Sequence, residues 1–228
     1  DNSSLSNQRI AKNTLFLYLR LVVIMLLNLL TTRFVLSALG VEDYGVYNVV
    51  CGFVAMFGFL NTSFTNGIQR FYNYELARNG EEGVTIVYNI GFLIQSSLSI
   101  IVILLLLTIG WWYLNNEMVI SESRMLAAKC VFFFSILSLS FVVMQALYSA
   151  AVIAYEKMGF YALVSVIEAV SKLAIAYSVK YASTDKLVLY GLLMLIMQLL
   201  ILLLYIGYCR FNFKHLRLQR KFVIFLML

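Results

Sequence analysis

Long apolar runs separated by short polar clusters make up most of the chain. Each run reaches about twenty residues or more, the length of helix that crosses a hydrocarbon layer of roughly 30 Å. The runs lack the regular alternation of apolar and polar residues that marks transmembrane strands. The pattern therefore predicts an all-α polytopic membrane protein with six transmembrane helices, over Thr14–Leu39, Tyr44–Tyr72, Val84–Leu114, Met125–Ala154, Phe160–Tyr181 and Leu187–Cys209.

The connections suggest one membrane lobe and a basic tail. Short connections alternate with longer polar ones, as in a bundle of antiparallel neighbours, so residues 1–209 are expected to form a six-helix membrane lobe. Residues 210–228 are expected to form a basic cytoplasmic segment and the truncated start of a seventh helix, Phe222–Leu228. The stretch Arg210–Lys221 could lie as an amphipathic segment on an anionic leaflet or be an ordinary positive flank.

The composition supports a membrane chain and narrows its chemistry. Hydrophobic residues make up 62% of the chain and charged residues 12%, which is too apolar for a soluble domain. The formal charge of +6 gathers at the ends of apolar runs and not on a soluble face, so no nucleic-acid binding is expected. Proline is absent, so any bend must come from glycines such as Gly52, Gly58 and Gly67.

Polar residues inside the spans are candidate functional sites, because an ionisable group at membrane depth is costly. In the first span, one arc of about 100° holds Arg9, Asn13, Arg20, Asn28 and Thr31. Arg20 lies roughly 9 Å past Thr14 at about 1.5 Å per residue. At that depth an arginine lines water or finds an acidic partner, unless it snorkels to the headgroups.

The second span carries a regular stripe of small and polar residues within about 100° of arc. Its members are Tyr44, Tyr47, Asn48, Cys51, Ala55, Gly58, Thr62, Asn66 and Gln69. Such a stripe either packs closely against another helix or faces an aqueous cavity. Its amides offer more hydrogen-bonding groups than close packing needs, which favours the cavity. The fourth span repeats the pattern more weakly, with Gln145 among serines that can bond their own helix backbone.

The fifth span holds the sharpest charged feature. Tyr161, Ser165, Glu168 and Lys172 fall within about 60° of arc. Glu168 precedes Lys172 by four residues, the spacing and order that favour an ion pair. Each charge lowers the cost of inserting the other, so the pair is either structural or serves ion coupling or substrate binding.

Several kinds of chemistry lack their motifs. The sequence has no GxxxxGK[ST] loop for ATP. The one histidine, His215, lies in the basic tail, and the three cysteines have no metal-ligand spacing. We therefore expect no enzyme activity, no cofactor and no metal site.

Two stretches resemble a known family. LGVEDYGVYN (Leu39–Asn48) and NGIQRFYNYELA (Asn66–Ala77), with NQRIAKNTLFLYLR before them, are similar to the start of bacterial O-antigen and polysaccharide flippases. These belong to the multidrug/oligosaccharidyl-lipid/polysaccharide exporter superfamily. The resemblance is specific over the first 80 residues, and over the rest only the topology is compatible.

The resemblance implies a fold and a function. Such transporters have twelve or more helices in two six-helix lobes around a central cavity, and this chain resembles the N-terminal lobe. The implied activity is flipping of undecaprenyl-pyrophosphate-linked sugar repeat units across the bacterial inner membrane for O-antigen, lipopolysaccharide or polysaccharide synthesis. The implied partners are the lipid-linked oligosaccharide, membrane lipids, a coupling proton or sodium ion, and a second lobe or second copy of the chain.

Two other functions stay open on the sequence. An ion-coupled drug antiporter of the same superfamily would use Glu168 as the coupling carboxylate. The second is a membrane interaction or scaffold protein that transports nothing. The single lobe makes it credible, because alternating access rocks one bundle against another around a fixed site.

The Lys and Arg residues predict the orientation. With the N-terminus inside, ten fall on the cytoplasmic side, four on the other side and three within spans, which accounts for all 17. Positive charge concentrates in cytoplasmic loops, so both termini and the loops near Arg78 and Lys157 should be cytoplasmic. Single cysteines in those loops should escape an external labelling reagent, and cysteines in Asn115–Glu122 should react. Strong external labelling near Arg78 would overturn the topology.

Overall fold

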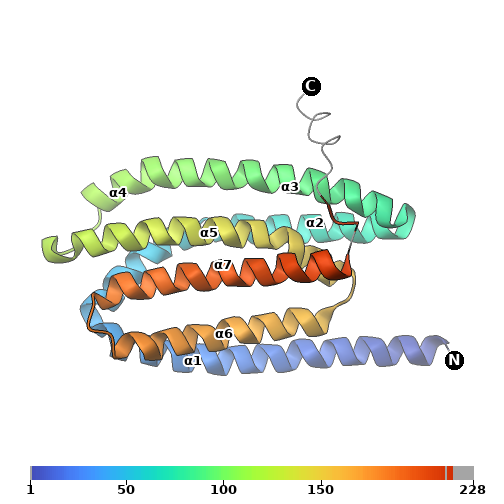
Figure 1. Ribbon diagram of the computed structural model, residues 1–228, viewed down its shortest axis with the longest axis horizontal. Coiled ribbons are helices and arrows are strands. Elements are labelled where there is room, and N and C mark those ends of the chain that lie inside the picture. Colours follow the sequence, from blue (N-terminus) through green and yellow to red (C-terminus); the bar gives the residue numbers. More distant parts are fainter. Residues whose placement is uncertain (1, 214, 218–228) are drawn as a thin grey trace.

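The computed structural model describes residues 2–213 and 215–217, and in this part of the chain every regular element is a helix. The long helices lie side by side in an elongated bundle (Figure 1). The long helices are α1 (Asn2–Ala55), α2 (Gly58–Arg78), α3 (Gly80–Leu105), α5 (Met125–Ala154), α6 (Met158–Lys180) and α7 (Lys186–Asn212), and α4 (Trp111–Asn116) is short. A π-helical turn at Leu106–Gly110 joins α3 to α4, and a 3-10 turn at Glu122–Arg124 precedes α5.

The described residues include five helical stretches long and apolar enough to cross a membrane. They are Tyr18–Ala55, Gly80–Asn116, Glu122–Ala154, Met158–Lys180 and Lys186–Asn212. The predicted fold class, an all-α polytopic membrane protein, is therefore confirmed. The predicted span Met125–Ala154 has the same bounds as α5, and the spans predicted at Phe160–Tyr181 and Leu187–Cys209 match α6 and α7 to within a few residues.

The chain turns sharply at Gly40, inside the bounds of α1. Gly40 has φ 82° and ψ 171°, a backbone conformation that is almost restricted to glycine. The residues before it run the length of the bundle, and the residues after it lead back toward α2 (Figure 1). The first predicted span, Thr14–Leu39, therefore ends where the structure turns, although α1 begins earlier, at Asn2.

The second predicted span, Tyr44–Tyr72, is wrong as a single helix. The last part of α1 ends at Ala55 and α2 begins at Gly58. Between them the amide of Phe57 donates to the carbonyl of Val54 at 3.1 Å, a bond to the third residue back that breaks the regular α-helical ladder. The break lies directly before Gly58, one of the glycines expected to allow bending, because glycine has a low helix propensity.

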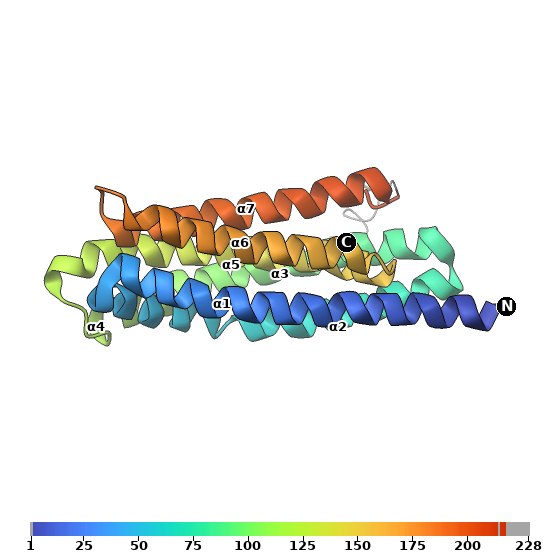
Figure 2. The same ribbon diagram turned by 90° about the horizontal axis from the view of Figure 1, so that it is seen from below.

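The two ends of the bundle contain different connections of the chain. One end, here named the turn end, contains the turn at Gly40 and the connections 117–124 and 181–185; the other, the terminal end, is where α1 begins and α7 ends (Figures 1 and 2). Among its neighbours α1 packs most extensively against α6, whereas α2 packs against α3 and α5, and α5 packs against α7. The first span and α2 are therefore held by different neighbours.

The segment after α7 folds back onto the bundle. Phe213 and Leu216 are buried, and the ring of Phe213 stacks on Tyr155 at 4.3 Å between centroids. Thr85 and Asn89 of α3 donate to the carbonyls of His215 and Arg217, at 3.1 and 3.2 Å.

In its described part, the basic segment therefore packs two of its apolar side chains, Phe213 and Leu216, into the protein core, while Phe211 is exposed. The predicted start of a seventh helix, Phe222–Leu228, lies outside the described residues.

Gly40 should tolerate substitution far less well than a glycine with ordinary backbone angles. Replacing Gly40 by alanine should cost about 1–3 kcal/mol of stability, because a Cβ strains this conformation. Gly45→Ala is the matched control: it lies a few residues away in the helix, and an added Cβ there meets nothing within 4 Å. Thermal unfolding in detergent measures both, and equal melting temperatures for the two variants would contradict the turn.

Candidate functional site

Arg20 lies in the seam between α1 and α6, against Tyr161. Its Nη2 donates to the Tyr161 hydroxyl at 3.4 Å, and its guanidinium carbon lies 4.4 Å from the centre of the tyrosine ring. The ring face attracts the cation and holds it in the seam. The Nε atom is buried and has no hydrogen-bond partner, and among the described residues no carboxylate lies within ion-pair distance of Arg20. In the part of the chain that the structure describes, the seam therefore contains a cation without an ion-paired carboxylate.

Glu168 and Lys172 form an ion pair on the same face of α6 as Tyr161. Lys172 Nζ donates to Glu168 Oε1 at 2.7 Å, and the side chains are 32% and 29% exposed. The pair predicted from the sequence is thus formed, and both members keep access to the surface. From α7, the buried Tyr205 lies within electrostatic reach of Arg20 and Glu168.

A groove runs beside Arg20 between α1 and α6. It has a volume of about 280 Å³. Apart from Arg20, its lining is apolar, from Leu19, Val23, Gly159, Ala162, Leu163 and Val166. A cationic group beside an apolar groove suits a ligand that carries both a charged headgroup and a hydrocarbon chain.

Five other predicted site residues lie apart from this seam. Asn28, Asn48, Thr62 and Asn66 are exposed on the surfaces of α1 and α2, and Gln69 is half-buried on α2. The Asn48 amide donates to the carbonyl of Tyr44 in its own helix at 2.9 Å. The structure therefore does not bring these residues together with Arg20, Glu168 and Lys172.

The stripe predicted on the second span divides into two faces. Cys51 packs inward, with its sulfur 3.1 Å from the Ser135 hydroxyl of α5, and Tyr47 packs against Tyr190 at 4.9 Å between ring centres. This inner face packs against other helices, which is the first of the two interpretations of the stripe. The face with Asn48, Thr62 and Asn66 points away from the core.

Gln145 belongs to a group of glutamine side chains between α3, α5 and α7. Its side-chain carbonyl accepts a hydrogen bond of 2.8 Å from Gln198 of α7, which is 7% exposed. Nearby, the fully buried Gln95 of α3 donates to the carbonyl of Val143 at 2.9 Å. These amides join α3, α5 and α7, so Gln145 holds helices together. The glutamines at 95 and 198 were missed, although each is an isolated amide in an apolar run.

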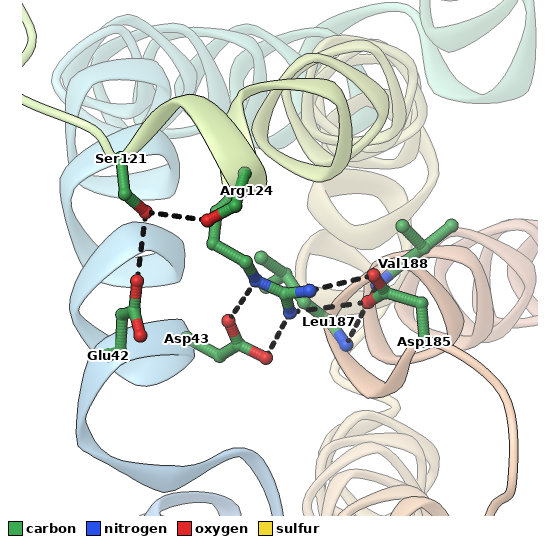
Figure 3. Close-up of polar contacts among 8 residues, drawn as sticks. Glu42, Asp43, Ser121, Arg124, Asp185, Leu187 and Val188 are labelled. Atoms are coloured by element: carbon green, nitrogen blue, oxygen red, sulfur yellow. Dashed lines mark hydrogen bonds and ion pairs between the residues drawn. The ribbon is translucent and has the colours of Figure 1, made fainter.

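A second charged cluster, also missed, lies at the turn end (Figure 3). Arg124 binds Asp43 through two nitrogens, with Nε donating at 2.6 Å, and its Nη1 donates to Asp185 at 2.9 Å. Ser121 donates to Glu42 at 2.8 Å beside it. From the sequence Arg124 counted only as a loop cation, because the partners come from connections far apart in the chain.

At the terminal end, His215 joins the tail to α3 and to the connection after α5. Its Nε2 lies 2.8 Å from the Tyr155 hydroxyl and its Nδ1 lies 3.4 Å from a carboxylate oxygen of Glu81. Burial, and to a lesser extent the charge of Glu81, raises the pKa of Tyr155 to about 12. The Tyr155 hydroxyl is therefore protonated at neutral pH and can donate to the imidazole.

Together these features define a multi-pass α-helical membrane protein with a charged seam between α1 and α6. Among the described residues, no group of three or more His, Cys, Asp or Glu side chains could hold a metal ion. No protein-family model matches the chain, and neither a curated protein nor a solved structure does. The resemblance to polysaccharide flippases therefore stays a prediction.

The Glu168–Lys172 pair should be more sensitive to losing one partner than to losing both. Lys172→Gln leaves an unpaired carboxylate and should destabilise more than the double change Glu168→Gln/Lys172→Gln. The loss should stay well below the roughly 3–5 kcal/mol of a fully buried pair, because about 30% of each side chain is exposed.

Thermal unfolding in lipid nanodiscs measures this difference, with Lys180→Gln as the control for removing an exposed lysine from the same helix. A double variant as unstable as Lys172→Gln would show that the pair does not offset the cost of its charges.

Proposed function

We propose that this chain translocates lipid-linked oligosaccharides, of the undecaprenyl-pyrophosphate-linked repeat-unit class, across the bacterial inner membrane for O-antigen or other polysaccharide synthesis. The observation that carries the proposal is Arg20, a cation in the α1–α6 seam with a buried unpaired Nε and no carboxylate within ion-pair distance among the described residues. In this proposal both termini are cytoplasmic, as the distribution of Lys and Arg predicts.

An arginine at membrane depth needs an anion or water to offset its charge. A pyrophosphate supplies oxygens that the planar guanidinium binds in a bidentate way, and a low-dielectric surrounding strengthens that contact. The apolar groove beside Arg20 would accept the first part of the polyprenyl chain. Arg20 would thus bind the headgroup of the lipid, and the groove beside it would bind the chain.

The charges of the seam favour an anionic substrate over a cationic drug. Glu168 is paired with Lys172 at 2.7 Å, so these two charges cancel. Among the described residues of the seam, the charge of Arg20 is then not cancelled, and the seam is net positive. A cationic drug would be repelled by this field, and a pyrophosphate would be attracted to it. The Glu168 carboxylate and the Lys172 ammonium remain partly exposed and could bind sugar hydroxyls.

The exposed polar residues of α1 and α2 support a hydrated path or a protein contact on that side. Asn28, Asn48, Thr62 and Asn66 are exposed, and lipid tails offer such side chains no hydrogen bonds. In the proposal this surface faces a central cavity, which a second lobe or a second copy of the chain completes. A proton or a sodium ion would drive the cycle.

Substitutions of Arg20 separate a pyrophosphate contact from a membrane anchor. In proteoliposomes made with the complete gene product, Arg20→Ala should abolish flipping of a labelled undecaprenyl-pyrophosphate-linked sugar. Arg20→Lys should restore only part of it, because an ammonium cannot reproduce the bidentate contact. Arg33→Lys is the matched control, since Arg33 is an exposed arginine farther along the same helix.

A snorkelling anchor needs only charge and reach, so full activity of Arg20→Lys would contradict the proposal. Uptake of fluorescent cationic drugs by the same proteoliposomes, without flipping of the lipid-linked sugar, would favour the antiporter. If the parent protein shows neither of these activities, the result favours a membrane interaction protein.

A further inference from the structure

A second groove, larger than the one beside Arg20, lies between α2 and α3. Its volume is about 500 Å³, within the roughly 300–1,000 Å³ of pockets that bind small ligands. Apart from Ser63, the side chains that line it are apolar, and they come from both helices. Ile68 is its buried part, whereas Phe71 and Ile90 are exposed along it. The groove is therefore an open apolar channel on the surface of the bundle.

Two glycines keep the groove free of side chains. Gly67 lines it from α2 and Gly91 lines it from α3. An added Cβ at Gly91 would meet Leu147 at 2.8 Å, so this glycine packs against the interior. An added Cβ at Gly67 would meet nothing within 4 Å. A larger side chain at position 67 would therefore enter open space and fill the groove without displacing the core.

The groove lies at membrane depth, on the apolar side of α2. The apolar stretch Gly80–Asn116, which contains α3, is long enough to cross a membrane, and α2 packs along α3. On α2, Gly67 and Phe71 lie at least about 100° around the helix from Asn66 and Asn73. One side of α2 is thus polar, and another presents the groove. A hydrocarbon chain in the groove would remove its apolar surface from any contact with water.

A cation follows the groove on the same face of α2, toward the terminal end of the bundle. Gly67, Phe71, Tyr74 and Arg78 fall within about 60° of arc. Arg78 Nη1 donates to the Tyr74 hydroxyl at 2.9 Å, and the guanidinium carbon lies 5.9 Å from the centre of the tyrosine ring. The side chain of Arg78 therefore points back along α2 toward the groove, the direction that helical side chains favour.

Arg78 has donors left for a ligand. Among the described residues, no carboxylate lies within ion-pair distance of Arg78. The carboxylate of Glu75, one turn earlier, accepts a hydrogen bond from Asn79 and lies against Gly83, in the contact between α2 and α3. Arg78 is exposed, and a guanidinium has five N–H donors. A phosphate at this end of the groove could therefore bind it in a bidentate way.

The shape of the groove favours a flexible chain over another helix. Helices pack closely in a membrane where small residues on the surface let their backbones approach. Here Phe71 and Ile90 project along the groove, and the small residue, Gly67, lies between them and the floor. Another backbone would be held away by these side chains, whereas an acyl chain can lie between them. A phospholipid also places its phosphate at the membrane surface and its chains at the depth of the groove.

We propose that the α2–α3 groove and Arg78 form a binding site for an anionic phospholipid, with an acyl chain in the groove and the phosphate on Arg78. The charge of Arg78 selects the anionic headgroup, and the open space at Gly67 admits the chain. This site lies on different helices from the α1–α6 seam. It does not depend on which substrate, if any, the protein moves.

Quenching of tryptophan fluorescence by brominated lipids tests the site. The reporter is Phe71→Trp, in a chain whose two tryptophans, Trp111 and Trp112, are replaced by phenylalanine. Phosphatidylcholine vesicles that contain this protein receive increasing amounts of brominated phosphatidylglycerol or of brominated phosphatidylcholine. Half-maximal quenching should need about fivefold less phosphatidylglycerol, the effect expected of one basic residue on an anionic lipid at a membrane surface.

Four variants of the reporter separate the groove from general attraction between charges. Arg78→Gln should remove the preference for phosphatidylglycerol. Arg70→Gln should keep it, because Arg70 is an exposed arginine of the same helix that lies about 70° away from the groove face. Gly67→Leu should remove the preference although Arg78 is intact, because leucine fills the groove. Gly207→Leu on α7 should keep it, and an added Cβ there also meets nothing within 4 Å.

Three results would overturn the site. Equal quenching by the two lipids in the reporter protein would show that no headgroup is selected. A preference that survives Gly67→Leu, or that Arg70→Gln lowers as much as Arg78→Gln, would show only general attraction of an anionic lipid to cations. Absence of quenching by either lipid would show that protein, such as a second copy of the chain, covers the groove. If an arginine variant fails to fold, the reporter and the two glycine variants still decide.

Discussion

A charge inside or beside a hydrocarbon layer has to be compensated, and this requirement organises most of the protein's polar chemistry. Glu168 and Lys172 compensate each other within one helix. Arg124 is compensated by two carboxylates that come from other connections. Arg20 has an aromatic ring and a hydroxyl from Tyr161, which stabilise a cation without neutralising it. The first two arrangements are closed within the protein, and the third leaves room for an anion from outside.

The turn at Gly40 and the contacts at the turn end help to position the seam between α1 and α6. The conformation at Gly40 sends the chain back across the bundle, and the contacts at the turn end fix where α1 lies relative to α5 and α7. Because α1 is placed along α6, Arg20 meets Tyr161, which is 141 residues away in the sequence. The position of Arg20 thus depends on packing that begins at the opposite end of α1.

Helix periodicity made many helix positions predictable, whereas contacts between residues far apart in the sequence were not predictable. Apolar runs located α5 to the residue, and the spacing of Glu168 and Lys172 predicted a pair that is formed. Gly58 was among the glycines expected to allow a bend, but the break before it was not predicted to divide the span, because one displaced backbone bond leaves no clear mark on the sequence.

Side chains that meet across helices were harder to foresee. A stripe on one helix does not say which neighbour covers it, so Cys51 and Asn48 could not be assigned to packing and to the surface beforehand. For the same reason Tyr205, Gln198 and the partners of Arg124 escaped the sequence analysis.

We propose that Arg20 binds the pyrophosphate of a polyprenyl lipid, and a direct binding measurement tests this contact without requiring transport. Native mass spectrometry of the purified protein with undecaprenyl pyrophosphate and with uncharged undecaprenol compares the headgroup and the chain separately. We expect the parent protein to retain the pyrophosphate lipid preferentially and Arg20→Ala to lose this preference while still binding undecaprenol. Equal retention of the two lipids by the parent protein, or an unchanged preference in Arg20→Ala, would contradict it.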